Sequence, residues 1–226
     1  KNEYSEEHAE FLEALSDYIA IAVENSISHE AIDKLNAQLQ EDKHKLQEAY
    51  HRIAFMANHD NLTGLPNRRL MSELLEKTIR TSRRENQRFA LLFVDLDNFK
   101  PINDSQGHKA GDAILAEVSQ RLSESLRDAD TIARIGGDEF LILLEHIGNK
   151  TSIVRVVKKL VRVFRSPFEY EGTFHTIGCS IGISVFPDDS EDQVELIQRA
   201  DQAMYHVKES GKSSFTFYSD ILSTLV

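Results

Sequence analysis

A long stretch without any helix breaker is the feature that most constrains how this chain can fold. From Ser5 to about Ala57 there is neither Pro nor Gly, and Leu, Ile, Ala, Glu, Lys and Gln predominate, which favours one continuous helix. Apolar or small residues recur there at steps of three and four, as in a coiled coil: Ile32, Leu35, Leu39, Leu46, Ala49, Ile53 and Met56. The alternative is a helix packed on its own domain. We favour pairing with a second copy, because nothing else in the chain is large enough to cover the stripe.

Composition narrows the class of protein. The 226 residues are 41% hydrophobic and 28% charged, as expected of a folded protein. The net charge of −11 argues against binding to nucleic acid or to an anionic membrane surface. Apolar runs are far shorter than the ~20 residues that a membrane helix needs. The single Cys179 excludes an intramolecular disulfide and favours the cytoplasm. The chain starts without Met inside a helical pattern, so we expect a further segment upstream.

Residues 58–66 interrupt the helical pattern with Asn, Asp, Gly and Pro, which marks a boundary. We therefore expect a helical segment at residues 1–57 and a separate domain at residues 58–226. In the latter, helical patterns at 67–84, 111–126, 152–164 and 194–210 alternate with strand patterns at 89–95, 131–135, 139–144, 174–185 and 214–218. Gly136 and Gly137 indicate a hairpin. This order predicts an α/β or α+β sandwich with helices packed on one sheet.

Carboxylates gather at two expected strand ends. Asp95 and Asp97 end an apolar run two residues apart, so their side chains share one side of the strand. Asp138 lies at the tip of the predicted hairpin. Brought together, such carboxylates would form a pocket for a hard divalent cation, which also takes substrate phosphates. A lone Asp-x-Asp pair is more often a solvated strand end, and the Gly-Gly turn could be ordinary.

The segment between these carboxylates is rich in polar side chains. Lys100 can meet a phosphate, while Asn103 and Asp112 together offer the donors and acceptors that complement a guanine edge. Taken singly, these residues are more often turn formers and the cap of a helix beginning near Gly111.

Several motifs in order resemble the diguanylate cyclase family, which is named for the Gly-Gly-Asp-Glu-Phe (GGDEF) signature present here at residues 136–140. Residues 60–68 resemble the family's D-x-L-T-G-L-x-N-R motif, and residues 95–112 resemble its D-x-D-x-F-K-x-x-N-D-x-x-G-H-x-x-G-D segment. The resemblance covers about 60–218. Upstream, residues 4–7 and 11–25 resemble the last helix of a GAF sensor domain, followed by a signalling coiled coil.

The resemblance implies an α+β fold, a ferredoxin-like βαββαβ domain related to nucleotide cyclases and polymerase palms. It implies that two GTP are joined into cyclic di-GMP with release of two pyrophosphates, in a homodimer in which two half-sites face each other. The implied metal ligands are Asp95, the carbonyl of Leu96 and Asp138, holding two Mg²⁺ per site with Mn²⁺ as an alternative. The implied proton acceptor is Asp138, or alternatively Glu139. The implied substrate-binding residues are Lys100, Asn103, His108, Asp112, Lys208 and Lys212.

Two further points concern the family pattern. Gly211, Lys212 and Ser213 stand where the family usually has Gly-Arg-Asn, so a forked guanidinium contact to phosphate becomes a point charge. Arg127 and Asp130 match the family's R-x-x-D site, at which the product cyclic di-GMP inhibits. Without the resemblance, those two residues would read as a helix end and a turn.

Three functions remain to be compared. The first is an active cyclase whose dimer is set by the coiled coil. The second is a catalytically silent domain that senses GTP or cyclic di-GMP, against which the full set of site residues argues. The third makes a mixed guanine-adenine product and is disfavoured, because Asp112 retains the carboxylate that reads guanine.

Overall fold

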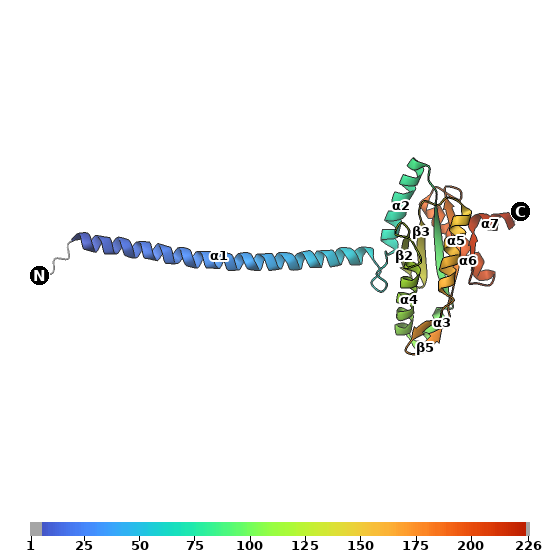
Figure 1. Cartoon of the computed structure of the whole chain (residues 1–226), viewed down its shortest axis with the longest axis horizontal. Coiled ribbons are helices and arrows are strands. Elements are labelled where there is room, and N and C mark those ends of the chain that lie inside the picture. Colours follow the sequence, from blue (N-terminus) through green and yellow to red (C-terminus); the bar gives the residue numbers. More distant parts are fainter. Residues whose placement is uncertain (1–5, 225–226) are drawn as a thin grey trace. The chain divides into compact units, whose positions relative to one another are not determined.

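The computed structural model describes residues 6–224 and divides into two compact units, one reaching Phe55 and one starting at Met56 (Figure 1). The first unit is the predicted helix, α1, which runs without a break over Glu6–Asn58 into the start of the second. In this single chain its apolar stripe is exposed, with Leu35 at 68%, Leu39 at 62% and Leu46 at 71%. Tyr4, on which part of the GAF resemblance rests, lies outside the described residues.

The second unit is built on a five-stranded sheet in the order β2-β3-β1-β6-β7. The strands are β1 (Phe89–Asp97), β2 (Thr131–Gly136), β3 (Glu139–Leu144), β6 (Gly178–Phe186) and β7 (Phe215–Phe217). All neighbours are antiparallel except β6 and β7. The first four of these strands and the helices between them form a βαββαβ unit with the central strand β1 flanked by β3 and β6. The predicted ferredoxin-like α+β fold is therefore confirmed.

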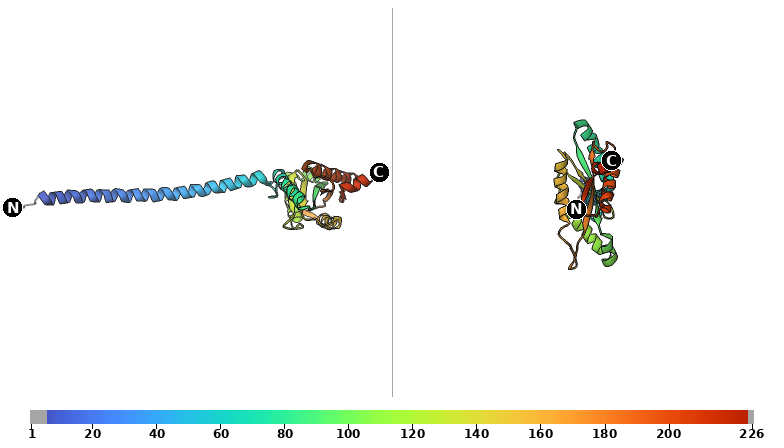
Figure 2. Two further views of the ribbon diagram at one scale, coloured as in Figure 1. Left: turned by 90° about the horizontal axis from the view of Figure 1, so that it is seen from above. Right: turned by 90° about the vertical axis from the view of Figure 1, so that its right-hand side faces the viewer.

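Helices cover both faces of the sheet. Helices α4 (His108–Ser123) and α5 (Lys150–Val163) pack on one face through one apolar cluster, and α2 (Arg68–Glu85) and α6 (Gln193–Glu209) pack on the other through a second. The right-hand view of Figure 2 shows α5 and α6 on opposite sides. Helix α6 approaches β6 very closely at Gly182. A Cβ built on this glycine would lie 2.0 Å from the carbonyl oxygen of Ala200. No side chain fits there.

Strand β1 alternates its side chains between the two apolar clusters, and all nine of its residues are buried. Burial on both faces explains why its sequence is a continuous apolar run and not an alternating one. The only cysteine, Cys179, lies beside it on β6 and is 1% exposed. Among the described residues, no helix is both long and apolar enough to cross a membrane.

Several predicted elements need correction. The helix expected from Gly111 begins at His108 and ends at Ser123, and it is preceded by a short helix α3 (Lys100–Gln106). Pro101 fits the first turn of α3, where its missing N–H costs nothing. Gly107, with φ of 82°, ends α3 and starts α4. A helix as short as α3 carries too few residues to show a periodic pattern.

The strand expected at 174–185 is two strands, β5 (Thr173–His175) and β6. Strand β5 pairs with β4 (Phe168–Tyr170) in a separate two-stranded sheet. The chain after β7 forms helix α7 (Tyr218–Thr224). Neither β4 nor α7 was expected from the sequence, since each is short and stabilised by packing rather than by a strong local pattern.

Candidate active site

The end of β1 opens into a cavity of about 250 Å³. Six of its lining residues were predicted for metal or substrate: Asp95, Leu96, Lys100, Asp138, Lys208 and Lys212. Strand pairing sets their positions. The amide of Leu96 donates to the carbonyl oxygen of Asp138 at 3.2 Å, so the hairpin tip lies against the end of β1. The structure therefore joins residues more than a hundred positions apart into one acidic and basic pocket.

Charges of opposite sign meet in this pocket. The ammonium Nζ of Lys208 lies 2.7 Å from Asp95 Oδ2. Burial raises the pKa of the Asp95 carboxyl above its ordinary value; the bond from Lys208 opposes this shift, and the negative charge of Asp138 adds to it. The negative charges of Asp95 and Asp138 repel each other, and a cation bound between the two carboxylates would relieve that repulsion.

The oxygen atoms fit a divalent cation. Carboxylates of Asp95 and Asp138 and the backbone carbonyl of Leu96 are hard ligands of the kind that Mg²⁺ and Mn²⁺ accept. In the described part of the chain, no three His, Cys, Asp or Glu side chains are grouped to hold a metal ion. Two carboxylates and a backbone carbonyl are the metal donors that these residues can supply.

Glu139 lies outside this cavity. It pairs with Asp95 across β3 and β1, so the two side chains share one face of the sheet. Its side chain lines a second cavity of about 480 Å³ together with Arg68 on α2 and Asp201 on α6. Partial burial raises the pKa of Glu139, and the charges of Asp95 and Asp201 raise it further.

The residues predicted to read guanine lie on the helix pair that follows β1. Asn103 is on α3, and His108 and Asp112 are on α4. None of the three lines the 250 Å³ cavity. A Cβ at Gly111 would lie 2.0 Å from Asn103 Oδ1, so the Asn103 side chain rests on the glycine next to Asp112. The lack of a side chain at Gly111 is what allows the Asn103 side chain to lie against the start of α4.

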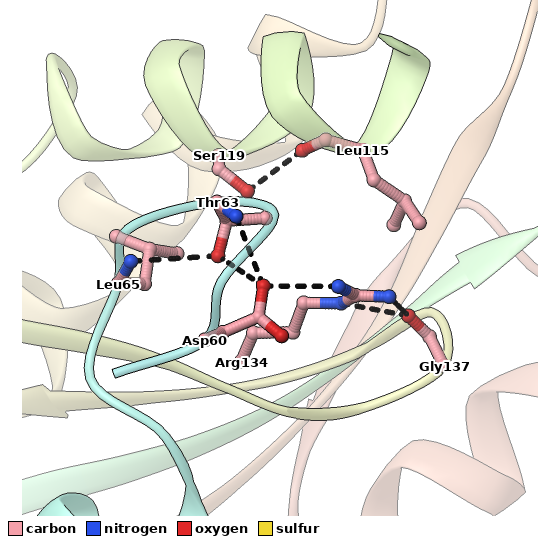
Figure 3. Close-up of polar contacts among 7 residues, drawn as sticks. All are labelled: Asp60, Thr63, Leu65, Leu115, Ser119, Arg134 and Gly137. Atoms are coloured by element: carbon pink, nitrogen blue, oxygen red, sulfur yellow. Dashed lines mark hydrogen bonds and ion pairs between the residues drawn. The ribbon is translucent and has the colours of Figure 1, made fainter. Parts of the chain in front are cut away.

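A network that the sequence reasoning missed ties the loop after α1 to the signature hairpin (Figure 3). Asp60 Oδ1 accepts from the amide of Thr63 at 3.0 Å, from its hydroxyl at 2.7 Å and from Arg134 Nη1 at 3.0 Å. Arg134 also donates Nε and Nη2 to the carbonyl oxygen of Gly137, at 3.0 and 2.8 Å. The available signal was a charged residue inside the otherwise apolar strand pattern at 131–135.

The same loop is fastened to the helices on either side of it. The amide of Asn67 donates to the carbonyl of Asn58 at 2.9 Å, and its side chain donates to the carbonyl of Ala57 at 3.0 Å. Asn67 Oδ1 in turn caps α2 by accepting from the amide of Leu70. The loop after α1 is therefore hydrogen-bonded both to the last residues of α1 and to the GGDEF hairpin.

Arg127 and Asp130 lie in the turn between α4 and β2, separate from the cavity. Asp130 Oδ2 accepts from the backbone amide of Arg127 at 3.2 Å and from its Nε at 3.3 Å. The side chain of Asp130 is 1% exposed and that of Arg127 is 64% exposed. Asp130 thus binds the backbone amide and Nε of Arg127, while most of the Arg127 side chain is exposed to solvent.

The fold and the pocket define a nucleotide-cyclase-type domain of the palm class. The family described as diguanylate cyclase, GGDEF domain, matches residues 57–214. The chain belongs to this family.

Relatives agree with this assignment. The bifunctional diguanylate cyclase/cyclic di-GMP phosphodiesterase MucR of Pseudomonas aeruginosa is 40% identical over 79% of this chain and 26% of its own length. A structure comprising only the GGDEF domain of TpbB from the same organism covers 73% of this chain and 99% of its own, with 33% identity and a TM-score of 0.69. The cyclic di-GMP phosphodiesterase NbdA, also from this organism, is 34% identical over 77% of this chain and 22% of its own length. The chain spans about a quarter of MucR and of NbdA.

The hydrogen bonds of Asp60 predict how acid affects stability. Partial burial raises the pKa of this carboxyl, but the bonds from Thr63 and Arg134 outweigh burial and hold the pKa below its ordinary value. The ionised group therefore stabilises the fold above the unfolded pKa of about 3.9, and this contribution is lost as the pH falls through the lower folded-state value. We expect the free energy of unfolding, measured by urea titration below about pH 5, to decline less steeply in Asp60→Asn than in the wild type.

Asp128→Asn provides the control, because it removes an exposed carboxylate that takes no part in this network. It should keep the wild-type profile. A profile for Asp60→Asn that is parallel to the wild type would show that these bonds do not favour the ionised group.

Proposed function

We propose that this chain condenses two GTP into cyclic di-GMP and releases two pyrophosphates. The observation that carries the proposal is the convergence of Asp95, Asp138, Lys100, Lys208 and Lys212 on one cavity in a member of the diguanylate cyclase family. In the reaction, each 3′-hydroxyl oxygen forms a bond to the α-phosphorus of the other GTP. The bond from that phosphorus to the β-phosphate bridge breaks, and pyrophosphate leaves.

The residues divide the task between the two ends of GTP. Asn103 and Asp112 accept and donate hydrogen bonds at the guanine edge, and His108 lies on the same helix as Asp112. The ammonium groups of Lys100, Lys208 and Lys212 bind phosphate oxygens. Because Lys212 replaces the usual arginine, its contact is a point charge without a fork, and weaker binding of GTP is expected than with arginine.

Asp95, Asp138 and the Leu96 carbonyl would hold the divalent ion, for which we propose Mg²⁺, two per site, with Mn²⁺ as a substitute. Such an ion neutralises phosphate charge and lowers the pKa of the attacking hydroxyl. Asp138 takes the hydroxyl proton in our proposal, with Glu139 as the alternative acceptor. The raised pKa of Glu139 makes it a stronger base than an ordinary free carboxylate.

The central test is incubation of the chain with GTP and Mg²⁺, with products separated by chromatography. We expect cyclic di-GMP and pyrophosphate. Asp138→Asn should lower the rate roughly 100-fold or more, as for other groups that stabilise transition-state charge, without changing the thermal unfolding midpoint by more than a few degrees. Glu169→Gln, an exposed change on β4, should leave the rate unchanged. Wild-type turnover by Asp138→Asn would refute the metal role.

The second candidate is a silent domain that binds GTP or cyclic di-GMP without turnover. One relative is named a cyclic di-GMP phosphodiesterase, and a domain of this family in such a protein need not make the dinucleotide. The incubation separates the candidates, since binding of GTP by calorimetry without formation of product would identify a sensor.

The reaction needs two half-sites that face each other, and we propose that α1 supplies the dimer. Its apolar stripe is exposed in the single chain. Burying it in a second copy would remove that surface from water at roughly 25 cal/mol per Å². A GAF-like domain upstream would then act on the site through the pairing of these helices.

The apolar stripe of α1, called the seam below, can be tested by placing a charge at two of its positions. Leu39→Asp with Leu46→Asp places a carboxylate at two seam positions, so we expect a monomer in sedimentation and a lower specific activity. Gln40→Asp with Gln47→Asp adds the same charge one residue away from the seam and should leave both measurements unaltered. If the seam variant remains a fully active dimer, α1 is not the dimerising element.

We also propose that cyclic di-GMP inhibits through Arg127 and Asp130. Asp130 Oδ1 is buried and finds no hydrogen-bond partner among the described residues, so it retains an acceptor for a guanine N–H group. The exposed Arg127 guanidinium can donate to guanine O6 and N7. A product bound in this turn would act on a pocket whose residues it does not touch.

Arg127→Ala tests this site. Initial turnover of GTP should stay within about twofold of the wild type, because the variant leaves the metal pocket intact. Inhibition by added cyclic di-GMP, and its tight binding in calorimetry, should disappear. Arg165→Ala removes another exposed arginine and should keep both. Unchanged inhibition of Arg127→Ala would leave this turn without a regulatory role.

A further inference from the structure

Asp97, the second carboxylate of the D-x-D pair, has both of its oxygens engaged by the protein itself. Oδ1 accepts from the hydroxyl of Ser180 at 2.7 Å. Oδ2 accepts from the backbone amide of Ser213 at 2.8 Å and lies 3.4 Å from its hydroxyl. Asp97 is 2% exposed and Ser180 is fully buried. The carboxylate is therefore part of a hydrogen-bonded clamp between β1, β6 and the loop after α6, and it also lines the cavity at the end of β1.

The loop that Asp97 holds has an unfavourable backbone conformation. Gly211, Lys212 and Ser213 have φ of 121°, 65° and 52°. Residues with a side chain rarely adopt such positive values, and two in succession are held only where surrounding bonds fix them. The amide of Lys212 is bonded to the carbonyl of Val207 at 3.0 Å, and the bond from Ser213 to Asp97 fixes the other end of the turn.

The loop carries a phosphate ligand of the proposed site. Lys212 lines the cavity at the end of β1, and its Nζ lies 3.0 Å from Asn98 Oδ1. Asn98 follows Asp97 directly and also has a positive φ, 61°. Asp97 thus helps to fix both ends of this lysine. It holds the backbone of the loop through Ser213, and its neighbour Asn98 contacts the ammonium group.

Strand β6 leaves space for the clamp at Gly178. A Cβ at Gly178 would lie 2.1 Å from Ser213 Oγ and 3.1 Å from Asp97 Oδ2. Gly178 is the pairing partner of Asp97 across β1 and β6. The absence of a side chain at this position is what lets the loop approach the carboxylate.

We propose that Asp97 is a positioning residue that fixes Lys212 for binding the triphosphate, and that it is not a metal ligand. Its role toward GTP rests on the proposed function; its hold on the loop does not. The three bonds from Ser180 and Ser213 occupy most of the roughly four acceptor sites of this carboxylate. A metal ion would compete with them and weaken the anchor of the loop. Asp95, two residues earlier, is instead held by a side chain of the cavity itself, since its Oδ2 lies 2.7 Å from Lys208 Nζ.

Two substitutions separate an anchor from a ligand. Asp97→Asn keeps an oxygen for the Ser213 amide, and its new amino group can donate to the Ser180 hydroxyl, which can also accept. Asp97→Ala removes both bonds. Hydrogen exchange of the Ser213 amide in the full chain should be faster in Asp97→Ala and close to wild type in Asp97→Asn. If Asp97→Ala does not fold, Gly178→Ala displaces the loop with Asp97 intact and should also speed this exchange.

The same variants are then titrated by calorimetry with a non-hydrolysable GTP analogue and Mg²⁺. Asp97→Ala should weaken binding about tenfold, as expected for loss of one charge-assisted contact, and Lys212→Ala should do the same. Because Asp97 acts through Lys212, the double variant should be no weaker than either single one. Asp97→Asn should bind within about twofold of the wild type, whereas Asp95→Asn should lose its Mg²⁺-dependent binding.

The outcomes can be told apart. Unchanged exchange of the Ser213 amide in both Asp97→Ala and Gly178→Ala overturns the anchor. Loss of Mg²⁺-dependent binding in Asp97→Asn makes Asp97 a metal ligand, and additive losses in the double variant mean that it does not act through Lys212. If the wild type binds the analogue and yet makes no cyclic di-GMP, the proposed function fails while these results still decide the role of Asp97.

Discussion

The placement of β1 between β3 and β6 is the constraint on which the rest of the structure depends. With neighbours on both sides and helices on both faces, the strand is buried along its whole length, and its backbone has little freedom. Carboxylates at its end are consequently held in place and partly removed from water. That arrangement is costly for a negative charge. It persists because each carboxylate has a compensating group: Lys208 at Asp95, and two serines at Asp97. The polar chemistry of the domain therefore depends on an apolar core.

Much of this could be predicted from the sequence, but unevenly. The unbroken α1 and the long apolar β1 followed from local composition, and the resemblance of the ordered motifs to the family predicted one site from Asp95, Asp138 and the lysines. The short α3 did not follow, since it depends on Pro101 and Gly107 and has no periodic pattern. Asp97 is the most instructive case. Spacing alone made it equivalent to Asp95, and only the approach of Ser213, 116 residues further along the chain, shows that the two carboxylates differ.

The Asp60 and Arg134 network could not be foreseen for a related reason. A motif shows which residues occur together, but not which atoms bond. The planar guanidinium of Arg134 faces two acceptors at once, a carboxylate from the loop after α1 and a carbonyl from the hairpin tip. Lysine could not hold both in fixed geometry. Gly137 is next to Asp138, a proposed metal ligand. A shift of the Asp60 loop would therefore move the backbone one residue away from that ligand.

The burial of Cys179 has a practical consequence. This thiol is the only one in the chain, it lies inside the sheet, and burial raises its pKa far above the ordinary value, so it is a poor nucleophile in the folded protein. Maleimide or nitroxide reagents should leave it untouched while the domain stays folded. A cysteine introduced on the exposed surface of α1 would then be the sole labelling site without removal of the native one. In the proposed dimer, the distance between the α1 helices of the two copies could then be measured with spin labels or fluorophores in an otherwise unaltered sequence.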